Sequence, residues 1–290
     1  MEYSMFDDGE IINKIANTLV TAGSTFSQDK INAYKRAIEK ETNPQSKWVM
    51  EKIVENALTA AKNKSPLCDD TGIPHIYIEL GKENYISGKV MEAIHIGIAK
   101  GLRLLPGRPM AVKGNDFQRL EQSEGMYENS DAVCAAPVQI KYTNNSVTRI
   151  YILMEGGGPA IRGKDYRVFH KHSIDTVIGE IVLWAKDAVA QLGCSPCTLA
   201  IGIGRSHYEA AALMMEAQVH GNYDIQSDLE KRITSEINKS NIGALGLGGK
   251  TSVIGTFLKV GPQRASGVRI VCLRPCCCFE PRVASMELPL

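Results

Sequence analysis

A chain of 290 residues can bury a full hydrophobic core and is long for a single domain. Hydrophobic residues make up 44% of it and charged residues 22%, as in an ordinary soluble globular protein. With 33 Lys and Arg against 32 Asp and Glu, no net charge favours nucleic acid or an anionic membrane, so we expect neither as a partner.

The N-terminus, residues 1–10, is acidic where a secretion signal would have a basic region followed by an apolar run. The sequence also lacks an uninterrupted apolar stretch of about 18 residues, the length that spans a bilayer. We therefore expect a cytoplasmic protein.

The first third of the chain is predicted to be mainly helical. Apolar residues recur at helical spacing over 11–20, 48–61 and 89–105. Asn43-Pro44 separates the first two helices, and Ser46 is placed to cap the second. Between the second and the third, residues 74–81 alternate as in a strand.

The middle of the chain is predicted to form strands over 133–142 and 146–155. Asn144-Asn145 between them predicts a β-hairpin. Further on, helices are expected at 173–192, 207–218 and 225–240, and strands at 198–203, 253–260 and 267–273.

This mixture lacks a regular βαβ alternation and favours the α+β class, with a helical N-terminal part packed on antiparallel or mixed sheets. We expect one domain over 1–290, or two lobes: about 1–110, mostly helical, and about 111–290, mixed α/β.

Eight cysteines in a chain without a secretion signal indicate metal or redox chemistry more than a disulfide framework. A single cysteine is usually a small buried hydrophobe, and we expect this of Cys134, which lies in an apolar stretch. The run Cys276-Cys277-Cys278 does not fit that role, because three adjacent thiols cannot all face one core.

Two further cysteine segments have polar neighbours. Cys68-Asp69-Asp70-Thr71-Gly72 combines a soft metal ligand with two carboxylates, although an Asp-Thr-Gly turn with an incidental cysteine explains it equally well. Cys194-Ser195-Pro196-Cys197 precedes a strand; a zinc site would need a second such pair, and a thioredoxin-like motif would follow a strand. Three separated cysteine regions could instead hold three irons of a [4Fe–4S] cluster and leave the fourth iron open as a Lewis acid.

Two glycine-rich segments remain, residues 156–158 and 243–251. The second ends in Gly-Lys-Thr like a phosphate-binding Walker A loop, but Ala244 occupies the position of its first glycine, so we reject nucleotide binding. Backbone amides of such a loop can still approach a carboxylate or a cluster. The histidines show no paired metal spacing, and for His75, next to the first cysteine segment, we expect a structural role.

Taken in order over about residues 60–285, these segments resemble the alpha region of class I fumarate hydratases and L-tartrate dehydratases. The family pattern consists of Cys-Gln-Asp-Thr-Gly, a triple glycine, Cys-Pro-Pro before a Gly-Ile-Gly strand, Gly-Leu-Gly-Gly-Lys-Thr, and Cys-aromatic-x-x-Arg. These correspond to residues 68–72, 156–158, 194–204, 246–251 and 278–282.

The resemblance implies that Cys68, Cys194 and Cys278 bind a [4Fe–4S] cluster with one open iron, and that Asp70 is the catalytic acid–base carboxylate beside it. It also implies a set of substrate-binding residues: Asp69, Arg108, Gly156, Gly157, Gly158 and Lys250. Arginine suits a carboxylate because it can pair with both oxygens.

The third ligand remains a choice between two thiols. Alignment on the following aromatic residue and arginine favours Cys278, and Cys276 is the alternative. On an extended backbone these two side chains would face one way and Cys277 the other.

The resemblance implies an iron–sulfur hydro-lyase that hydrates fumarate to malate or dehydrates a hydroxy-acid such as tartrate. Asp69 replaces the family glutamine, and Pro159-Ala160-Ile161 follows the triple glycine, so the choice of dicarboxylate substrate stays open. A separate beta subunit is expected to complete the active site in a homo- or hetero-oligomer. The alternative is a non-catalytic metal- or cluster-binding protein, which would have no use for Asp70 beside an open metal position.

Overall fold

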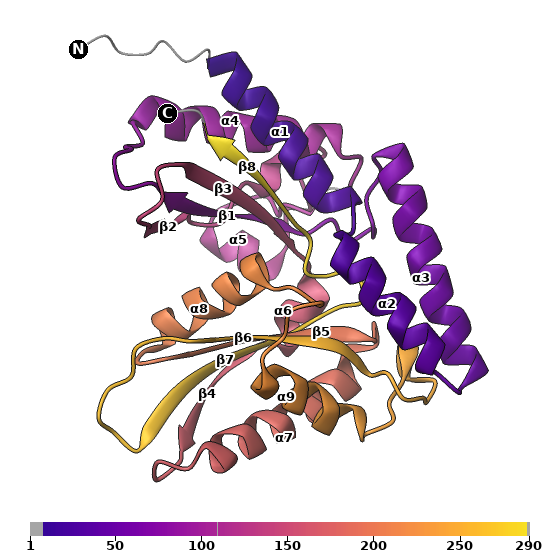
Figure 1. Cartoon of the computed structure of the whole chain (residues 1–290). Helices are drawn as coiled ribbons and strands as arrows, with labels where there is room; N and C mark the ends of the chain where they lie inside the picture. Colours follow the sequence, from indigo (N-terminus) through magenta and orange to yellow (C-terminus); the bar gives the residue numbers. More distant parts are fainter. Residues whose placement is uncertain (1–7, 109, 289–290) are drawn as a thin grey trace. The chain divides into compact units, whose positions relative to one another are not determined.

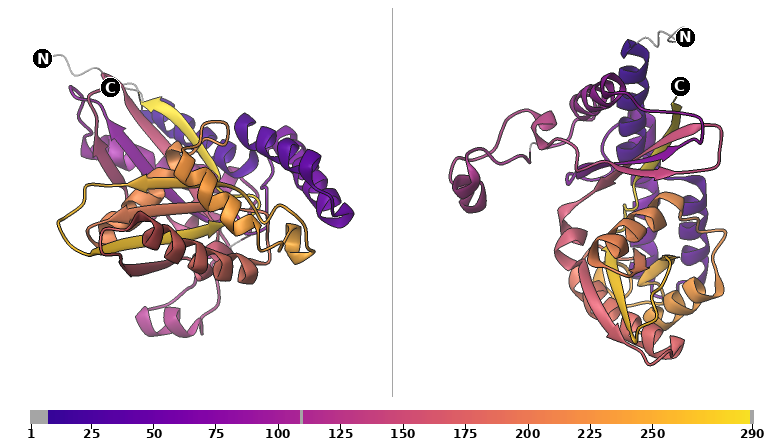
Figure 2. Two further views of the ribbon diagram at one scale, coloured as in Figure 1. Left: turned by 60° about the horizontal axis from the view of Figure 1, so that its bottom comes forward. Right: turned by 90° about the vertical axis from the view of Figure 1, so that its left-hand side faces the viewer.

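The computed structural model describes residues 8–108 and 110–288, and Figures 1 and 2 show its helices and strands. The helices are α1 (Asp8–Ser24), α2 (Gln28–Lys40), α3 (Pro44–Asn63), α4 (Gly88–Leu104), α5 (Asp116–Glu121), α6 (Gly157–Arg162), α7 (Ile174–Leu192), α8 (His207–His220) and α9 (Asp228–Asn238). The strands are β1 (Ile73–Leu80), β2 (Gln139–Tyr142), β3 (Thr148–Glu155), β4 (Lys164–Phe169), β5 (Cys197–Gly204), β6 (Val253–Val260), β7 (Val268–Cys276) and β8 (Val283–Leu288). Within the described ranges, no helix is both long and apolar enough to cross a bilayer.

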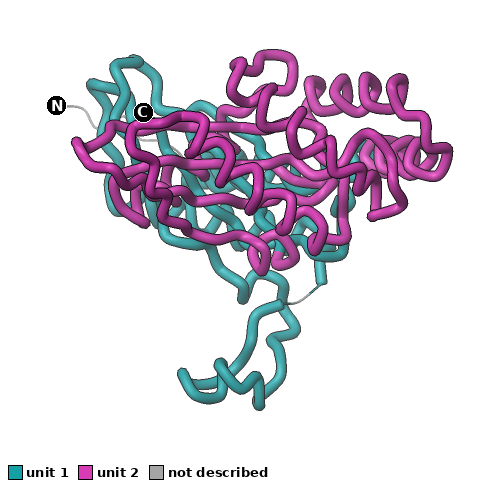
Figure 3. The backbone as a smooth tube through the Cα atoms, turned by 90° about the horizontal axis from the view of Figure 1, so that it is seen from below, with its two compact units in different colours: residues 1–25, 59–156, 282–290 teal, residues 26–58, 157–281 magenta. Residues whose placement is uncertain are grey.

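The chain folds into two compact units, each assembled from separate segments (Figure 3). Unit 1 consists of Met1–Thr25, Thr59–Gly156 and Arg282–Leu290. Unit 2 consists of Phe26–Leu58 and Gly157–Pro281. Each unit combines helices with a sheet of mixed strand direction, which confirms the α+β class.

The sheet of unit 1 has the strand order β2-β1-β3-β8, with α1 on β3 and β8 and α4 beside α1 (Figure 1). β1 is parallel to β2 and antiparallel to β3, and β8 is antiparallel to β3. The core joins Ile15 and Leu19 of α1, Ile94 of α4, Ile76 of β1 and Ile152 of β3, all fully buried. Burial of each such side chain contributes about 1.5–3 kcal/mol, so this core anchors β1 and the loop that precedes it.

Helix α5 lies in an extension of unit 1 that leads away from the sheet (Figure 2). Asn115 and Gln118 cap it reciprocally, and an isolated bridge pairs Val112 with Met126. Phe117 and Leu120 are exposed, so α5 is held by local hydrogen bonds and not by the core.

The sheet of unit 2 has the strand order β4-β7-β5-β6. Helix α8 covers one face, and α7 and α9 cover the other (Figure 1). Every residue of β5 is buried, as expected of a central strand that has helices on both faces. Helix α2 contributes Ala33 to a small apolar cluster with Ala217, Tyr223 and Phe257.

The predicted hairpin at Asn144-Asn145 is wrong. β1 lies between β2 and β3, and the turn bonds to the end of β1 through Thr143 N to Leu80 O and Lys82 N to Asn145 O, both 2.9 Å. Three of the four residues of β2 are exposed, whereas β1 has consecutive buried apolar residues, so β1 takes the inner position.

Two local expectations also need correction. Ser46 does not cap α3; the Asn43 Oδ1 atom accepts from Gln45 N and Ser46 N at 2.9 and 3.2 Å, and the Ser46 hydroxyl donates to Gly248 O. Cys134 is exposed and not buried, because it ends a 3₁₀ turn with a left-handed φ of 55° instead of continuing a strand.

The strongly patterned elements agree with the sequence. Strand 253–260 is β6 with the same bounds, helix 173–192 is α7 with Ser173 as its N-cap, and helix 89–105 is α4. β4, β8 and the short helices α5 and α6 were not expected, and helices 11–20 and 48–61 have α2 between them.

Candidate active site

The first cysteine segment forms the loop between α3 and β1 in unit 1. The partly buried Cys68 thiol donates to Asp69 Oδ1 at 3.4 Å, and Asp70 N donates to the same oxygen at 3.0 Å. These two hydrogen bonds, with nearby Arg108, hold the pKa of Asp69 below its usual value. Asp69 is therefore an anion at neutral pH.

Arg108 reaches this loop from the end of α4. Its Nη1 atom lies 3.4 Å from Asp69 Oδ2, and both side chains are largely exposed. The preceding residue, Gly107, packs directly on Thr71, since a Cβ atom there would lie 2.1 Å from Thr71 Oγ1. The structure thus brings Cys68, Asp69 and Arg108 together through backbone packing, because an exposed ion pair alone contributes little.

Arg282 fixes the backbone of Asp70. The Arg282 side chain is 2% exposed and donates from Nη1 to Asp70 O at 2.8 Å and from Nε to Met154 O at 3.2 Å. Gly72 allows this arrangement: its φ is +89°, and a Cβ atom there would lie 2.8 Å from Arg282 Nη2. The sequence indicated Arg282 only as the last residue of a motif. In the structure its side chain links the Asp70 loop to β3 within unit 1.

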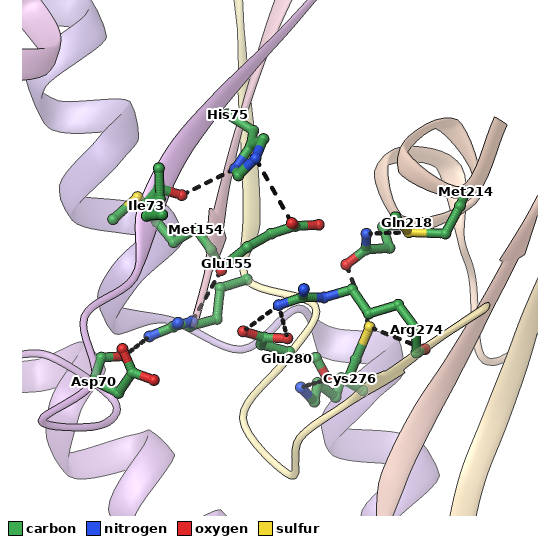
Figure 4. A network of polar contacts seen from close by, with 12 residues as sticks. Asp70, Ile73, His75, Met154, Glu155, Met214, Gln218, Arg274, Cys276 and Glu280 are labelled. Carbon is green, nitrogen blue, oxygen red and sulfur yellow. Dashed lines mark hydrogen bonds and ion pairs between the residues drawn. The ribbon is translucent and has the colours of Figure 1, made fainter. Parts of the chain in front are cut away.

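His75 and Glu155 form a partly buried pair in unit 1, where β1 begins and β3 ends. His75 Nε2 is 3.7 Å from Glu155 Oε2, and His75 Nδ1 is 3.1 Å from Ile73 O (Figure 4). The two side chains are only 18% and 11% exposed. The sequence predicts a structural role for His75, next to the first cysteine segment, but nothing in it indicates Glu155 as its neighbour.

The other two predicted ligands lie side by side in unit 2. Cys278 N donates to Cys194 O at 2.9 Å, which ties the turn after β7 to the segment before β5. Cys194 is exposed and Cys278 is 4% exposed. This contact brings together two cysteines that are 84 positions apart in the printed sequence.

The cysteine run is not extended as expected. β7 ends at Cys276, and Glu280 N then bonds to Cys277 O at 2.9 Å to close a turn. The fully buried Cys276 thiol donates to Gln218 Oε1 at 3.3 Å (Figure 4). The three neighbouring thiols therefore occupy different surroundings, set by where the strand stops.

Protonation in this region is governed by hydrogen bonding and burial. A hydrogen bond with Cys277, followed by burial, raises the pKa of the Cys278 thiol well above its usual value. Burial also raises the pKa of Cys197, which lies inside β5. Lys30 of α2 is buried, which lowers its pKa to about 8 against the opposing effect of the nearby cysteines. A metal that binds Cys278 must displace a proton.

The donor chemistry of these residues fits an iron–sulfur cluster. Cys68, Cys194 and Cys278 are thiols, the ligand type that holds such clusters, and two of them share a backbone hydrogen bond in unit 2. Across residues 8–108 and 110–288, no group of three or more His, Cys, Asp or Glu side chains is already arranged to hold a metal ion.

The Gly-Leu-Gly-Gly-Lys-Thr segment binds a carboxylate of the protein itself. Glu41 is 6% exposed and accepts hydrogen bonds from Lys250 N at 2.9 Å and Thr251 N at 3.2 Å. It also accepts from Thr42 N and Asn43 N at 2.9 and 3.0 Å. The amides that a phosphate would use are thus occupied, while the Lys250 side chain is exposed.

The triple glycine is divided between the two units. Gly156 is buried at the end of β3 in unit 1, whereas Gly157 and Gly158 are exposed in the first turn of α6 in unit 2. Pro159, which follows the triple glycine, is buried in this short helix.

Residues 12–287 match the family model described as Fumarate hydratase (Fumerase). The chain belongs to the fumarate hydratase family. The match includes every motif segment from residue 68 to residue 282, which confirms the resemblance.

Curated relatives of this fumarate hydratase family member agree with that assignment. The protein named "Putative L(+)-tartrate dehydratase subunit alpha" of Methanocaldococcus jannaschii is 27% identical over 275 residues, which cover 91% of this chain and 92% of that protein. L(+)-tartrate dehydratase subunit alpha of Escherichia coli strain K12 is 22% identical over 268 residues, which cover 90% and 86%. Family and relatives together indicate a hydro-lyase.

Proposed function

We propose that this fumarate hydratase family member is the alpha subunit of an iron–sulfur hydro-lyase acting on a small dicarboxylate. Hydration of fumarate to malate is the first candidate reaction, and dehydration of a tartrate-type hydroxy-acid is the second. The observation that carries the proposal is the 2.9 Å hydrogen bond from Cys278 N to Cys194 O, which places side by side two residues whose thiols are the ligand type of iron–sulfur clusters.

Cys194 and Cys278 would hold a [4Fe–4S] cluster together with Cys68, a partly buried thiol beside two carboxylates. When bound, the cluster supplies an open iron that acts as a Lewis acid. The alternative ligand Cys276 is less suited, because its thiol donates to Gln218 Oε1, whereas Cys278 is the residue whose backbone is bonded to Cys194.

Asp70 would carry the proton that leaves with the substrate hydroxyl. Its main chain is fixed by Arg282, so the position of its carboxylate is restricted before substrate arrives. Preorganisation of this kind is what general acid–base catalysis requires, since a misplaced carboxylate loses rate steeply.

Arg108 would bind one substrate carboxylate through its guanidinium group. In the structure that group faces the anionic Asp69, which occupies the place of the family glutamine. A dianionic substrate must therefore compete with Asp69 for Arg108. We propose that Lys250 and the amides of Gly156, Gly157 and Gly158 bind the remaining substrate oxygens.

The relatives named above are alpha subunits, and we propose that this chain likewise assembles with a separate beta subunit. That subunit would supply the base for the carbon-bound proton and further carboxylate-binding groups.

Anaerobic reconstitution with iron and sulfide, together with the beta subunit, tests the proposal. We expect brown protein with an absorption shoulder at about 400 nm and turnover of fumarate, malate or tartrate. Colourless protein that takes up zinc instead, without dehydratase activity, would favour a metal-binding protein and contradict the proposal.

A further inference from the structure

Two buried polar side chains of α2 donate to the turn that carries Cys278. Lys30 Nζ donates to Glu280 O at 2.7 Å, and Tyr34 Oη donates to Cys278 O at 2.7 Å. Lys30 is 1% exposed and Tyr34 is fully buried. The two residues are four positions apart, so they share one face of the helix.

The same turn is held from two other sides. The Glu280 carboxylate accepts from Arg274 Nη2 at 3.1 and 3.3 Å, and this ion pair is buried (Figure 4). Cys278 N is bonded to Cys194 O. The backbone around Cys278 is therefore fixed by α2, by β7 and by the segment before β5, all within unit 2.

Core packing alone does not explain these α2 residues. Removing an ammonium group from water is unfavourable, and a methionine would fill the same space without that penalty. The Phe26 ring lies 4.2 Å from Lys30 Nζ and stacks on Tyr34, which restricts both side chains. Their polar ends are aimed at carbonyl groups two residues apart, on each side of Phe279.

We propose that Lys30 and Tyr34 are positioning residues for Cys278: by holding the carbonyls of Cys278 and Glu280, they keep this thiol beside Cys194 in the protein before any metal binds. That this arrangement serves to retain a cluster rests on the proposed function. The arrangement itself does not.

Hydrogen exchange on the full-length protein without metal tests the arrangement. Tyr34→Phe removes only the hydroxyl that donates to Cys278 O, and we expect the amides of residues 277–280 to exchange about tenfold faster. Tyr223→Phe is the matched control, because it removes another buried hydroxyl of unit 2, one that bonds to Thr198 Oγ1 at 2.6 Å and not to the turn. Equal exchange in the turn of both variants would overturn the proposal.

Iron release from reconstituted protein to a chelator tests the purpose. We expect Tyr34→Phe and Lys30→Met to lose iron about tenfold faster than the wild type, and Tyr223→Phe to match the wild type at a similar melting temperature. Release at the wild-type rate from Tyr34→Phe would refute a role in cluster retention. Wild-type protein that binds no cluster would refute the proposed function, and the exchange experiment would then decide the arrangement alone.

Discussion

At the scale of single residues, the Glu41 carboxylate occupies backbone amides that could otherwise bind an anionic ligand. Its carboxylate accepts four backbone N–H groups, two of them from Lys250 and Thr251 in the glycine-rich segment. The sequence motif resembles a phosphate-binding loop for a physical reason, since both arrangements gather amides around an anion.

Replacing Glu41 by Gln should lower the free energy of unfolding by about 2 kcal/mol, because hydrogen bonds to a charged acceptor are replaced by weaker or missing ones. Denaturant unfolding of the metal-free protein measures this. Glu39→Gln, an exposed change in the last turn of α2, just before Glu41, should be within about 0.5 kcal/mol of the wild type. Equal losses in both variants would show that the buried contacts of Glu41 contribute nothing.

Asp70 is the proposed acid–base carboxylate. Asp70→Asn keeps the shape of the side chain and the backbone bond to Arg282, so the cluster should assemble with the same iron content. Turnover should fall by about 10²–10⁴ because the acid–base group is lost. Wild-type turnover in this variant would remove Asp70 from the mechanism.

The sequence predicted which residue types could form the site, but not the contacts that hold them in place. Cysteine, aspartate and arginine residues occur in the order of the family motifs, and this order indicates which positions could bind a cluster or a substrate. Three contacts depend on tertiary packing between distant segments, which no local pattern encodes. They are the hydrogen bond from Arg282 to Asp70, the pairing of His75 with Glu155, and the hydrogen bonds from α2 to the Cys278 turn.

At the scale of elements, the loop between α3 and β1 is shaped by Gly72. Gly72→Ala should destabilise the protein by about 2–4 kcal/mol, because it combines a left-handed backbone with a Cβ atom that would lie 2.7 Å from the Glu155 backbone. Thermal unfolding measures the change. Gly179→Ala in α7, where a Cβ atom meets nothing within 4 Å, should be neutral or stabilising. Comparable melting temperatures for the two variants would contradict this view of the loop.

The spacing of apolar residues predicted most helices and strands, but it did not predict which strands pair with each other. Adjacent strand patterns at 133–142 and 146–155 predicted a hairpin, yet the more apolar β1 lies between the observed strands β2 and β3. β4 and β8 lack a clear alternating burial pattern, since only one residue of each is fully buried, so sequence periodicity could not detect them.

At the scale of the whole molecule, the residues proposed to bind the cluster and the substrate are divided between the two units. Unit 1 carries Cys68, Asp70 and Arg108, and unit 2 carries Cys194, Cys278 and Lys250. The chain passes from one unit to the other within two of the motifs, after Gly156 and after Pro281. Motif order along the sequence therefore revealed the family, but it did not reveal that the motifs belong to different units.

Iron content after anaerobic reconstitution of single Cys→Ser variants is the most direct test of the central claim, that Cys68, Cys194 and Cys278 hold the cluster. Serine is a poor iron ligand at neutral pH, so each of these three variants should lose the cluster and its absorption at about 400 nm. Cys134→Ser, an exposed change outside the proposed ligand set, should keep both. Loss of the cluster from Cys276→Ser but not from Cys278→Ser, or equal loss from all variants including Cys134→Ser, would contradict the claim.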